Sequence, residues 1–315
     1  MIRVTDILGD GFLSQELGPF AINETAVNAT LVSKECEGSN KAILYIHGYV
    51  DYFFQHHLAN QAVAAGYHFY ALDLHYCGRS LREGQIPHFC KDVSDYYPEI
   101  SAALDVIREH DDIETVIGNF HSTGGPIGLL YTQDHPNSKT FDGLVLNSPF
   151  LDFNDSWINE EVMIKVVASL GSIFPEQALP GGLSSVYGES VHKDFRGEWD
   201  YRLDWKPIAG FPARAGWIRA IQNAHQKIHQ GLNLSCPILS MFSSASSQPK
   251  EFDELTQKTD TVLDVVDIAR YSMNLGEDIT LKPFVGGMHD LVLSPEPVRS
   301  NVMNEMFSWL KYKGI

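Results

Sequence analysis

The amino-acid sequence predicts an α/β fold, in which a mostly parallel central sheet is flanked by helices and interrupted by an inserted helical lid. Apolar runs of strand length alternate with stretches that place apolar residues at helical spacing. This alternation predicts a parallel sheet with right-handed crossovers. It stops after Pro149 and resumes at Pro237, so we expect a core made of residues 1–149 and 236–315 with an insertion at 150–235.

Each predicted strand is a short run that ends at a polar or turn-forming residue. The first two, 11–16 and 26–34, precede a polar turn. Continuous apolar runs follow, and such runs suit strands that are buried on both faces. The later predicted strands are 42–46, 68–72, 115–117, 143–146, 237–243 and 279–285. The predicted helices are 54–65, 94–110, 123–134 and 296–312.

Length and composition are those of a globular chain with one or two domains. The chain has 315 residues, of which 44% are hydrophobic and 20% charged. No run approaches the roughly 18 apolar residues that a membrane span needs, so we expect no integral membrane segment. The net charge of −17 opposes binding to nucleic acid and favours solubility.

The cysteines and the first residues indicate a cytoplasmic protein. Four scattered cysteines form no Cys-x-x-Cys pair, which fits a reducing compartment. Residues 1–10 lack an apolar signal stretch. The sequence leaves the oligomeric state open.

Ser122 is the predicted nucleophile, because it stands where a buried strand turns into a helix. The local string is Phe120-His121-Ser122-Thr123-Gly124-Gly125. In a nucleophile elbow the serine takes a strained backbone conformation, so that its hydroxyl stands clear of the strand end. The following helix N-terminus supplies N–H groups and a partial positive charge close to a developing oxyanion.

Two features of this string allow another interpretation. The usual elbow pattern is G-x-S-x-G, but Phe120 occupies the first glycine position, and a bulky ring there must find room in a neighbouring strand or helix. A serine before a helix is also an ordinary N-cap. The buried strand before Ser122 and the Gly-Gly pair with a helix after it favour the elbow.

An oxyanion hole is predicted from two strand ends. His47-Gly48-Tyr49 closes the strand 42–46, and Gly48 allows the backbone to approach a ligand closely. We expect the backbone N–H groups of Tyr49 and Thr123 to point at the substrate oxygen. The alternative is a simple strand-to-loop turn. In either case, we expect the His47 side chain to be partly buried and bonded to backbone.

The base is predicted to be His289, because a serine hydroxyl needs a neighbouring base at neutral pH. His289 lies in a glycine-containing loop between the last predicted strand and the last helix. It also follows the order serine, acid, histidine of this class of site. His225 and His229 are four residues apart and could hold a metal, but no third ligand accompanies them. A solvated helix face is the preferred interpretation there.

The acid is predicted to follow the strand 237–243. The candidates are Asp253, Asp260, Asp264 and Asp267. Asp260 is the first choice, because the apolar stretch after it could anchor its loop. Asp264 is the second choice, although it could instead begin a helix. The acid would hold the tautomer of His289 and stabilise the imidazolium.

These motifs together resemble the α/β-hydrolase superfamily, and within it the group of monoacylglycerol lipases, lysophospholipases and serine aminopeptidase-like proteins. The resemblance rests on five strings: His47-Gly48-Tyr49, Asp73-Leu74-His75-Tyr76-Cys77-Gly78-Arg79-Ser80, His121-Ser122-Thr123-Gly124-Gly125, Asp260-Thr261-Val262-Leu263-Asp264 and Gly287-Met288-His289-Asp290. It implies a lid inserted after the sixth core strand, and Asp51 matches an acidic position of the family.

The sequence departs from the family pattern in three places. Phe120 replaces the elbow glycine, and His75 and Cys77 depart from the family's D-x-R-G-x-G-x-S segment. In addition, residues 244–259 separate Asp260 from the preceding strand, where a short loop is expected.

The sequence therefore predicts a serine hydrolase that cleaves a carboxylic ester of a small-molecule acyl substrate through an acyl-enzyme on Ser122. Neither a metal nor an organic cofactor is expected. Acyl transfer or peptide cleavage by the same triad, and an inactive binding protein on the same fold, are the alternatives. The insertion is expected to be a lid that forms the acyl pocket, although clustered tryptophans also suit an ordinary core. These are Trp157, Trp199, Trp205 and Trp217.

Overall fold

The computed structural model describes residues 2–109, 113–136, 140–153, 169–179 and 184–315. Nine strands form one sheet in the order β1-β2-β3-β5-β4-β6-β7-β8-β9. The strands are β1 (Val4–Thr5), β2 (Leu13–Ile22), β3 (Thr25–Lys34), β4 (Lys41–Ile46), β5 (His68–Asp73), β6 (Thr115–His121), β7 (Gly143–Asn147), β8 (Ile238–Ser243) and β9 (Ile279–Phe284). The pairs from β5 through β9 are parallel, whereas β1, β2 and β3 form an antiparallel edge. This mostly parallel sheet confirms the predicted fold class.

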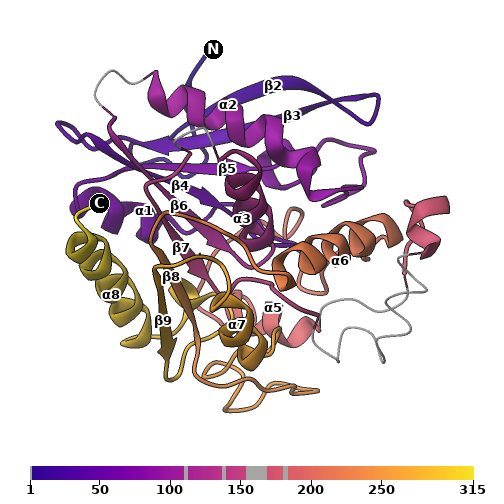
Figure 1. Ribbon diagram of the computed structural model, residues 1–315. Helices are drawn as coiled ribbons and strands as arrows, with labels where there is room; N and C mark the ends of the chain where they lie inside the picture. The colour runs from indigo at the N-terminus through magenta and orange to yellow at the C-terminus, as the bar shows by residue number, and fades with distance from the viewer. Residues whose placement is uncertain (1, 110–112, 137–139, 154–168, 180–183) are drawn as a thin grey trace.

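Helices cover both faces of the sheet and create two apolar cores (Figure 1). The helices are α1 (His56–Ala64), α2 (Tyr97–Arg108), α3 (Gly124–Asp134), α5 (Ser185–Val191), α6 (Ala215–His229), α7 (Val265–Ser272) and α8 (Val298–Lys313). Residues of α2, α3, α6 and α7 fill the larger core, and residues of α1 and α8 fill the core on the opposite face. The strands between them are buried on both sides, which explains their continuous apolar runs.

The first strands are longer than the sequence analysis predicts. β2 extends to Ile22 rather than ending at residue 16, and its register with β3 shifts between Leu17 and Phe20. Gly18 and Pro19 lie at that shift, where a proline does not have to donate to the ladder. A Gly-Pro pair inside a strand resembles a turn in sequence, and this explains the short prediction.

The Phe120 ring, which replaces the elbow glycine, fits because two other glycines make room for it. Phe120 is fully buried, and its ring faces Phe141 with centroids 5.4 Å apart. A Cβ atom on Gly118 would lie 2.4 Å from this ring, and one on Gly128 of α3 would lie 2.3 Å from it. Gly118 shares a face of β6 with Phe120, since residues two apart on a strand point the same way. The space for the Phe120 ring is therefore provided by the missing side chains of Gly118, two residues earlier on β6, and Gly128, in the second turn of α3.

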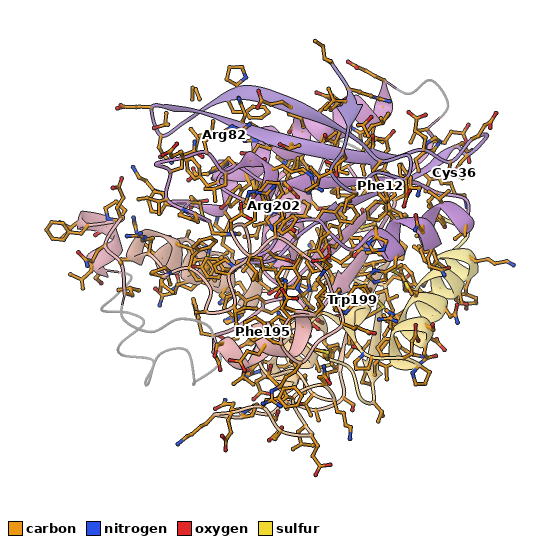
Figure 2. All side chains as sticks on the ribbon, turned by 180° about the vertical axis from the view of Figure 1, so that it is seen from behind. Phe12, Cys36, Arg82, Phe195, Trp199 and Arg202 are labelled. Atoms are coloured by element: carbon orange, nitrogen blue, oxygen red, sulfur yellow. The ribbon has the colours of Figure 1, made fainter. Side chains whose placement is uncertain are left out.

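Residues 150–235, the segment between the paired strands β7 and β8 that we call the insertion, include α5 and α6 in their described part. In Figure 2, which labels Trp199 and Arg202, Trp199 lies beside helix α8, and the Arg299 guanidinium of α8 stacks on its ring at 4.7 Å. The expectation for Trp157 falls outside the described residues.

The prediction of a solvated face for His225 and His229 is wrong. The Nε2 atom of His225 lies 2.8 Å from the carbonyl oxygen of Phe150, and that of His229 lies 2.7 Å from the carbonyl of Leu151. His225 is buried, and burial lowers the pKa of its imidazole to about 3. The chain leaving β7 has carbonyl groups without strand partners, and these two histidines supply the donors.

Candidate active site

The predicted reacting groups meet at one edge of the sheet. Ser122 follows β6, Asp260 follows the loop after β8, and His289 follows β9. Because these strands are parallel, their carboxyl ends lie at the same edge, which is where ligands bind in open α/β sheets. Residues separated by up to 167 positions in sequence therefore come within hydrogen-bonding distance.

Ser122 has the strained backbone that an elbow requires. Its φ angle is 51°, in the left-handed region that non-glycine residues rarely adopt. The turn is held by two backbone bonds, from the Ser122 N–H to the Asn147 carbonyl at 3.0 Å and from the Phe150 N–H to the Ser122 carbonyl at 2.9 Å. Thr123, not Ser122, occupies the N-cap position of α3. The serine hydroxyl is therefore directed away from capping and towards His289.

His289 bridges the serine and the acid. Its Nε2 lies 3.1 Å from the Ser122 Oγ, and its Nδ1 lies 2.9 Å from the Asp260 Oδ2. A carboxylate can only accept, so Nδ1 carries the proton and Nε2 presents a lone pair to the serine hydroxyl. Only 3% of His289 and 0% of Asp260 is exposed, and the low local dielectric strengthens both interactions.

Asp260 lies beside the end of β8 even though residues 244–259 separate the two in sequence. Asp260 forms a parallel bridge with Ser246, and its N–H donates to the Ala245 carbonyl at 2.9 Å. Residues 244–259 thus return the chain to the end of β8, as a short loop would. The second carboxylate oxygen accepts the N–H groups of Val262 and Leu263, each at 2.8 Å.

Asp264, the second choice for the acid, serves a different purpose here. Its carboxylate accepts the Val266 N–H at 2.9 Å and is the N-cap of α7. Of the two candidates, the structure thus brings Asp260 to His289 and directs the Asp264 side chain into a helix end.

The two residues of the predicted oxyanion hole lie beside Ser122. Tyr49 and Thr123 line the same pocket as Ser122 and His289. Gly48 is needed for this approach, since a Cβ atom there would lie 2.9 Å from the Ser122 Cβ. Likewise, a Cβ atom on Gly124 would lie 2.5 Å from the Ile46 carbonyl oxygen, so the start of α3 packs directly against the end of β4.

His47 is fully buried rather than partly buried, and it bonds to backbone as expected. Its Nε2 accepts the Leu74 N–H at 3.2 Å, and its Nδ1 donates to the Gly48 carbonyl at 2.8 Å. The Leu74 donor fixes the tautomer, because Nε2 must carry the lone pair. This histidine therefore shapes the strand end that leads to Tyr49.

A buried polar layer behind the triad was missed by the sequence analysis. Asp290 is fully buried and accepts the Asn147 side-chain amide at 2.7 Å and the Gln55 amide at 3.1 Å. The Tyr187 hydroxyl, from the insertion, accepts the Asp290 N–H at 3.3 Å. Asn147 ends a buried strand, and a polar residue at that position was a signal that could have been used.

Three acceptors in this layer lie close enough to hold a metal ion. Ligand atoms of Asp51, His121 and Asp290 all fall within 4.8 Å of one another. However, the Lys206 ammonium lies 2.6 Å from the Asp51 Oδ1, and the two amides occupy the Asp290 carboxylate. A cation would have to replace these donors, so the residues fit a hydrogen-bonded network better than a metal site.

The charges in this layer shift two pKa values. Burial acts to raise the pKa of Asp51, but the Lys206 ammonium, 2.6 Å away, is the largest of the causes that outweigh it and lower that pKa. Burial is the main cause that lowers the pKa of His121, against the opposing carboxylates of Asp290 and Asp51. Asp51 is therefore a carboxylate and His121 a neutral imidazole near neutral pH.

A pocket opens onto Ser122 and His289. Aromatic and aliphatic side chains form much of its wall, and Asp51 and Lys206 form a polar part. The residues that the insertion contributes include Phe150, Ser184, Tyr187, Tyr201, Lys206, Ile208 and Trp217.

The two departures in the segment after β5 are paired within the core. The His75 Nδ1 contacts the Glu99 carboxylate, and both side chains are buried. The Cys77 sulfur lies 3.2 Å from the His88 Nδ1, and burial raises the pKa of the thiol. The His88 ring in turn lies 5.3 Å from the Tyr49 ring.

The fold and the site define an α/β-hydrolase, and comparison with known proteins places the chain within that class. The sequence profile of the family described as Serine aminopeptidase, S33 matches residues 38–296, and the chain belongs to this family. A monoacylglycerol lipase of Mycolicibacterium smegmatis is 25% identical over 271 residues, which cover 85% of this chain and 87% of that protein.

Solved structures confirm the fold. A monoacylglycerol lipase of Paleococcus ferrophilus superposes with a TM-score of 0.68 at 18% identity and covers 87% of this chain and 95% of its own. A soluble variant of monoglyceride lipase from Saccharomyces cerevisiae, in complex with a substrate analogue, has a TM-score of 0.68 at 16% identity and covers 92% of each chain. The predicted family and the predicted class, a serine hydrolase of the esterase and lipase type, are thus confirmed.

In the part of the chain that the structure describes, no helix combines the length and apolar character that crossing a membrane requires.

Proposed function

We propose that the protein hydrolyses a carboxylic ester with an apolar acyl group through an acyl-enzyme on Ser122. His289 acts as the general base and acid, and Asp260 orients its ring. The observation that carries the proposal is the continuous hydrogen-bonded line from the Asp260 carboxylate through both nitrogens of His289 to the Ser122 hydroxyl. This is the geometry that activates a serine hydroxyl as a nucleophile.

Each step of the proposed reaction uses one of these groups. The Ser122 Oγ attacks the ester carbon while its proton passes to the His289 Nε2, and the carbonyl oxygen becomes an oxyanion facing the N–H groups of Tyr49 and Thr123. The carbon–oxygen bond of the ester then breaks, and the imidazolium gives its proton to the departing alkoxide. Water attacks the acyl-enzyme by the same route, which releases the acid and restores Ser122.

The pocket supports an apolar acyl group. Its lining includes, together with Ser122, the apolar side chains of Phe150, Trp217, Val262 and Leu263. Each substrate methylene buried there would gain about 0.8 kcal/mol. A monoacylglycerol or lysophospholipid, with one acyl chain and a polar alcohol, has the corresponding chemistry, and one relative carries the name monoacylglycerol lipase.

Peptide cleavage after a free amino group is less well supported. An aminopeptidase needs a carboxylate to bind the substrate ammonium, and among the described residues of the pocket wall the carboxylate, Asp51, is already paired with Lys206 at 2.6 Å. Binding an ammonium there would leave Lys206 buried without its partner, which is costly.

The test is covalent labelling combined with a substrate panel. A fluorophosphonate should label the wild-type protein, and Ser122→Ala should remove the label while the protein stays folded by circular dichroism. Ser240→Ala is the matched control, since its buried hydroxyl contacts Ser272 at 2.8 Å and not His289. Turnover of monoacylglycerols and p-nitrophenyl esters, with none of aminoacyl p-nitroanilides, supports the proposal. Labelling that persists in Ser122→Ala refutes it.

A further inference from the structure

The loop that carries the Tyr49 N–H is held from outside by the insertion. The Tyr49 ring packs on Trp217 with centroids 4.1 Å apart, and its hydroxyl donates to the Phe211 carbonyl at 3.3 Å. Three residues further on, the Tyr52 hydroxyl accepts the Arg202 N–H at 2.8 Å. Residues 202–217 therefore contact both ends of the short segment 49–52.

Between these contacts lies a buried ion pair. The Lys206 Nζ is 2.6 Å from the Asp51 Oδ1, and the side chains of both residues are at least nine-tenths buried. The ammonium also faces the rings of Phe54 and Tyr201, at 5.3 and 5.6 Å from their centroids. Among the described residues, the other Asp51 oxygen has no hydrogen-bond donor. Lys206 is thus the direct neutralising partner of a carboxylate two residues after Tyr49.

The backbone of this loop needs such a restraint. Val50, between Tyr49 and Asp51, has a φ angle of 51°, and β-branched residues rarely adopt this conformation. A strained conformation persists only when the surrounding structure over-determines it. The direction of the Tyr49 N–H depends on the peptide that joins it to Gly48, so a relaxation around Val50 would be transmitted to the proposed oxyanion site.

We propose that Lys206 is a positioning residue for the reaction, which holds Asp51 and so fixes the loop that presents the Tyr49 N–H to the oxyanion. This inference rests on the proposed function. It assigns to the insertion a part in transition-state stabilisation, in addition to forming the pocket wall. Because the restraint acts on the oxyanion donor, its loss should slow the chemical step more than it weakens substrate binding.

The test compares Lys206→Met with Lys193→Met. Lys193 belongs to the same insertion and pairs with Asp200 at the same 2.6 Å, but that pair is exposed. Displacing a catalytic group by about 1 Å costs on the order of 100-fold in rate. We expect Lys206→Met to lower kcat for a p-nitrophenyl ester by about 10- to 100-fold, with KM changed by less than about threefold. Lys193→Met should match the wild type in both.

A second variant separates positioning from direct contact and from misfolding. Lys206→Met leaves the buried Asp51 charge unpaired, whereas the double variant Asp51→Asn/Lys206→Met removes that charge. If Lys206 acts through Asp51, the double variant should recover part of the kcat lost in Lys206→Met, about threefold. It also gives a folded protein for kinetics if the single variant does not fold, and its kcat should then still lie below that of the wild type.

A transition-state mimic supplies the last readout. The affinity for a trifluoromethyl ketone, which forms an oxyanion on the serine, should fall by the same factor as kcat. An unchanged kcat in Lys206→Met, a loss confined to KM, or a double variant that recovers none of the lost kcat would overturn the proposal. Fluorophosphonate labelling of the wild type but not of Ser122→Ala, measured alongside, shows whether a failure concerns Lys206 alone or the proposed function as a whole.

Discussion

The strand-end loops of the core and the inserted segment build the two halves of the site in different ways. The core loops supply Ser122, Asp260 and His289, from the segments that follow the parallel strands β6, β8 and β9. The insertion supplies pocket walls and lateral contacts, such as Trp217 on Tyr49 and Lys206 on Asp51. In the core, sheet topology brings the groups together, whereas in the insertion individual side-chain contacts do so.

The two regions should therefore respond differently to amino-acid substitution. A strand-end group is held by ladders on both sides, for example the Ser122 N–H on the Asn147 carbonyl at 3.0 Å. Its geometry therefore survives substitution of the side chain itself. A contact from the insertion depends on two side chains alone, so its loss shifts whatever it holds. Substitutions of the reacting groups in the core loops should abolish catalysis, whereas substitutions in the insertion should change the rate or the substrate preference.

The largest expected effect comes from the acid in the core. Asp260→Asn should lower kcat by about 10⁴-fold, because an amide favours the wrong tautomer of His289. Asp264→Asn is the matched control four residues away, and it should leave kcat within about twofold, since an asparagine also caps a helix. The measurement is steady-state hydrolysis of one ester by both variants.

A reversed result, with Asp264→Asn the crippled enzyme, would mean that the loop after β8 does not place Asp260 at the base. Thermal unfolding of both variants is the control for folding, because Asp260 also accepts two backbone N–H groups at 2.8 Å.

A smaller effect is expected where the core adapts to Phe120. Gly128→Ala would place a methyl group 2.3 Å from the Phe120 ring. Overpacking of this kind costs about 1–3 kcal/mol of the free energy of unfolding. In a Phe120→Ala background the ring is gone, and the same Gly128→Ala change should cost little. Urea unfolding of the four proteins measures this coupling.

Equal destabilisation by Gly128→Ala in both backgrounds would show that the glycine is needed by the helix backbone and not by the ring. The space for the Phe120 ring would then not depend on the absence of a side chain at Gly128.

The sequence was informative where local pattern and topology agree. The buried runs, the strand–turn–helix at Ser122 and the glycine-containing loop at His289 identify strand ends, and parallel strands bring such ends together. The fold, the family and the enzyme class were predicted and are confirmed, whereas the roles of Ser122, His289 and Asp260 remain predictions that the geometry supports.

What the sequence did not predict depends on side-chain contacts between distant segments. Nothing near Lys206 in sequence indicates a partner 155 residues away at Asp51. The compensation of Phe120 by Gly128 and the donors that His225 and His229 supply to residues 150–151 are of the same kind. Local periodicity contains no information about these pairings, and only the packed structure reveals them.

The smallest expected effect lies in the insertion and concerns acyl-chain preference. Trp217 is buried and lines the pocket, so Trp217→Ala should lengthen the apolar space beside Ser122. Because each additional buried methylene gains about 0.8 kcal/mol, the preferred p-nitrophenyl ester should become about one to three carbons longer, with a few-fold change in relative kcat/KM per carbon. Trp199→Ala is the control, since Trp199 belongs to the insertion and instead stacks on His57 at 4.3 Å.

Relative preference is the right readout for this variant, because Trp217 also packs on Tyr49 and its loss can slow every ester equally. A uniform slowing cancels when kcat/KM values for different chain lengths are divided by one another, whereas a change of pocket shape does not. If both tryptophan variants keep the wild-type profile, the insertion acts on the reaction through the Tyr49 loop and not through the acyl pocket. If the chain-length profile shifts in Trp217→Ala and not in Trp199→Ala, the insertion shapes the acyl pocket in addition to contacting the Tyr49 loop.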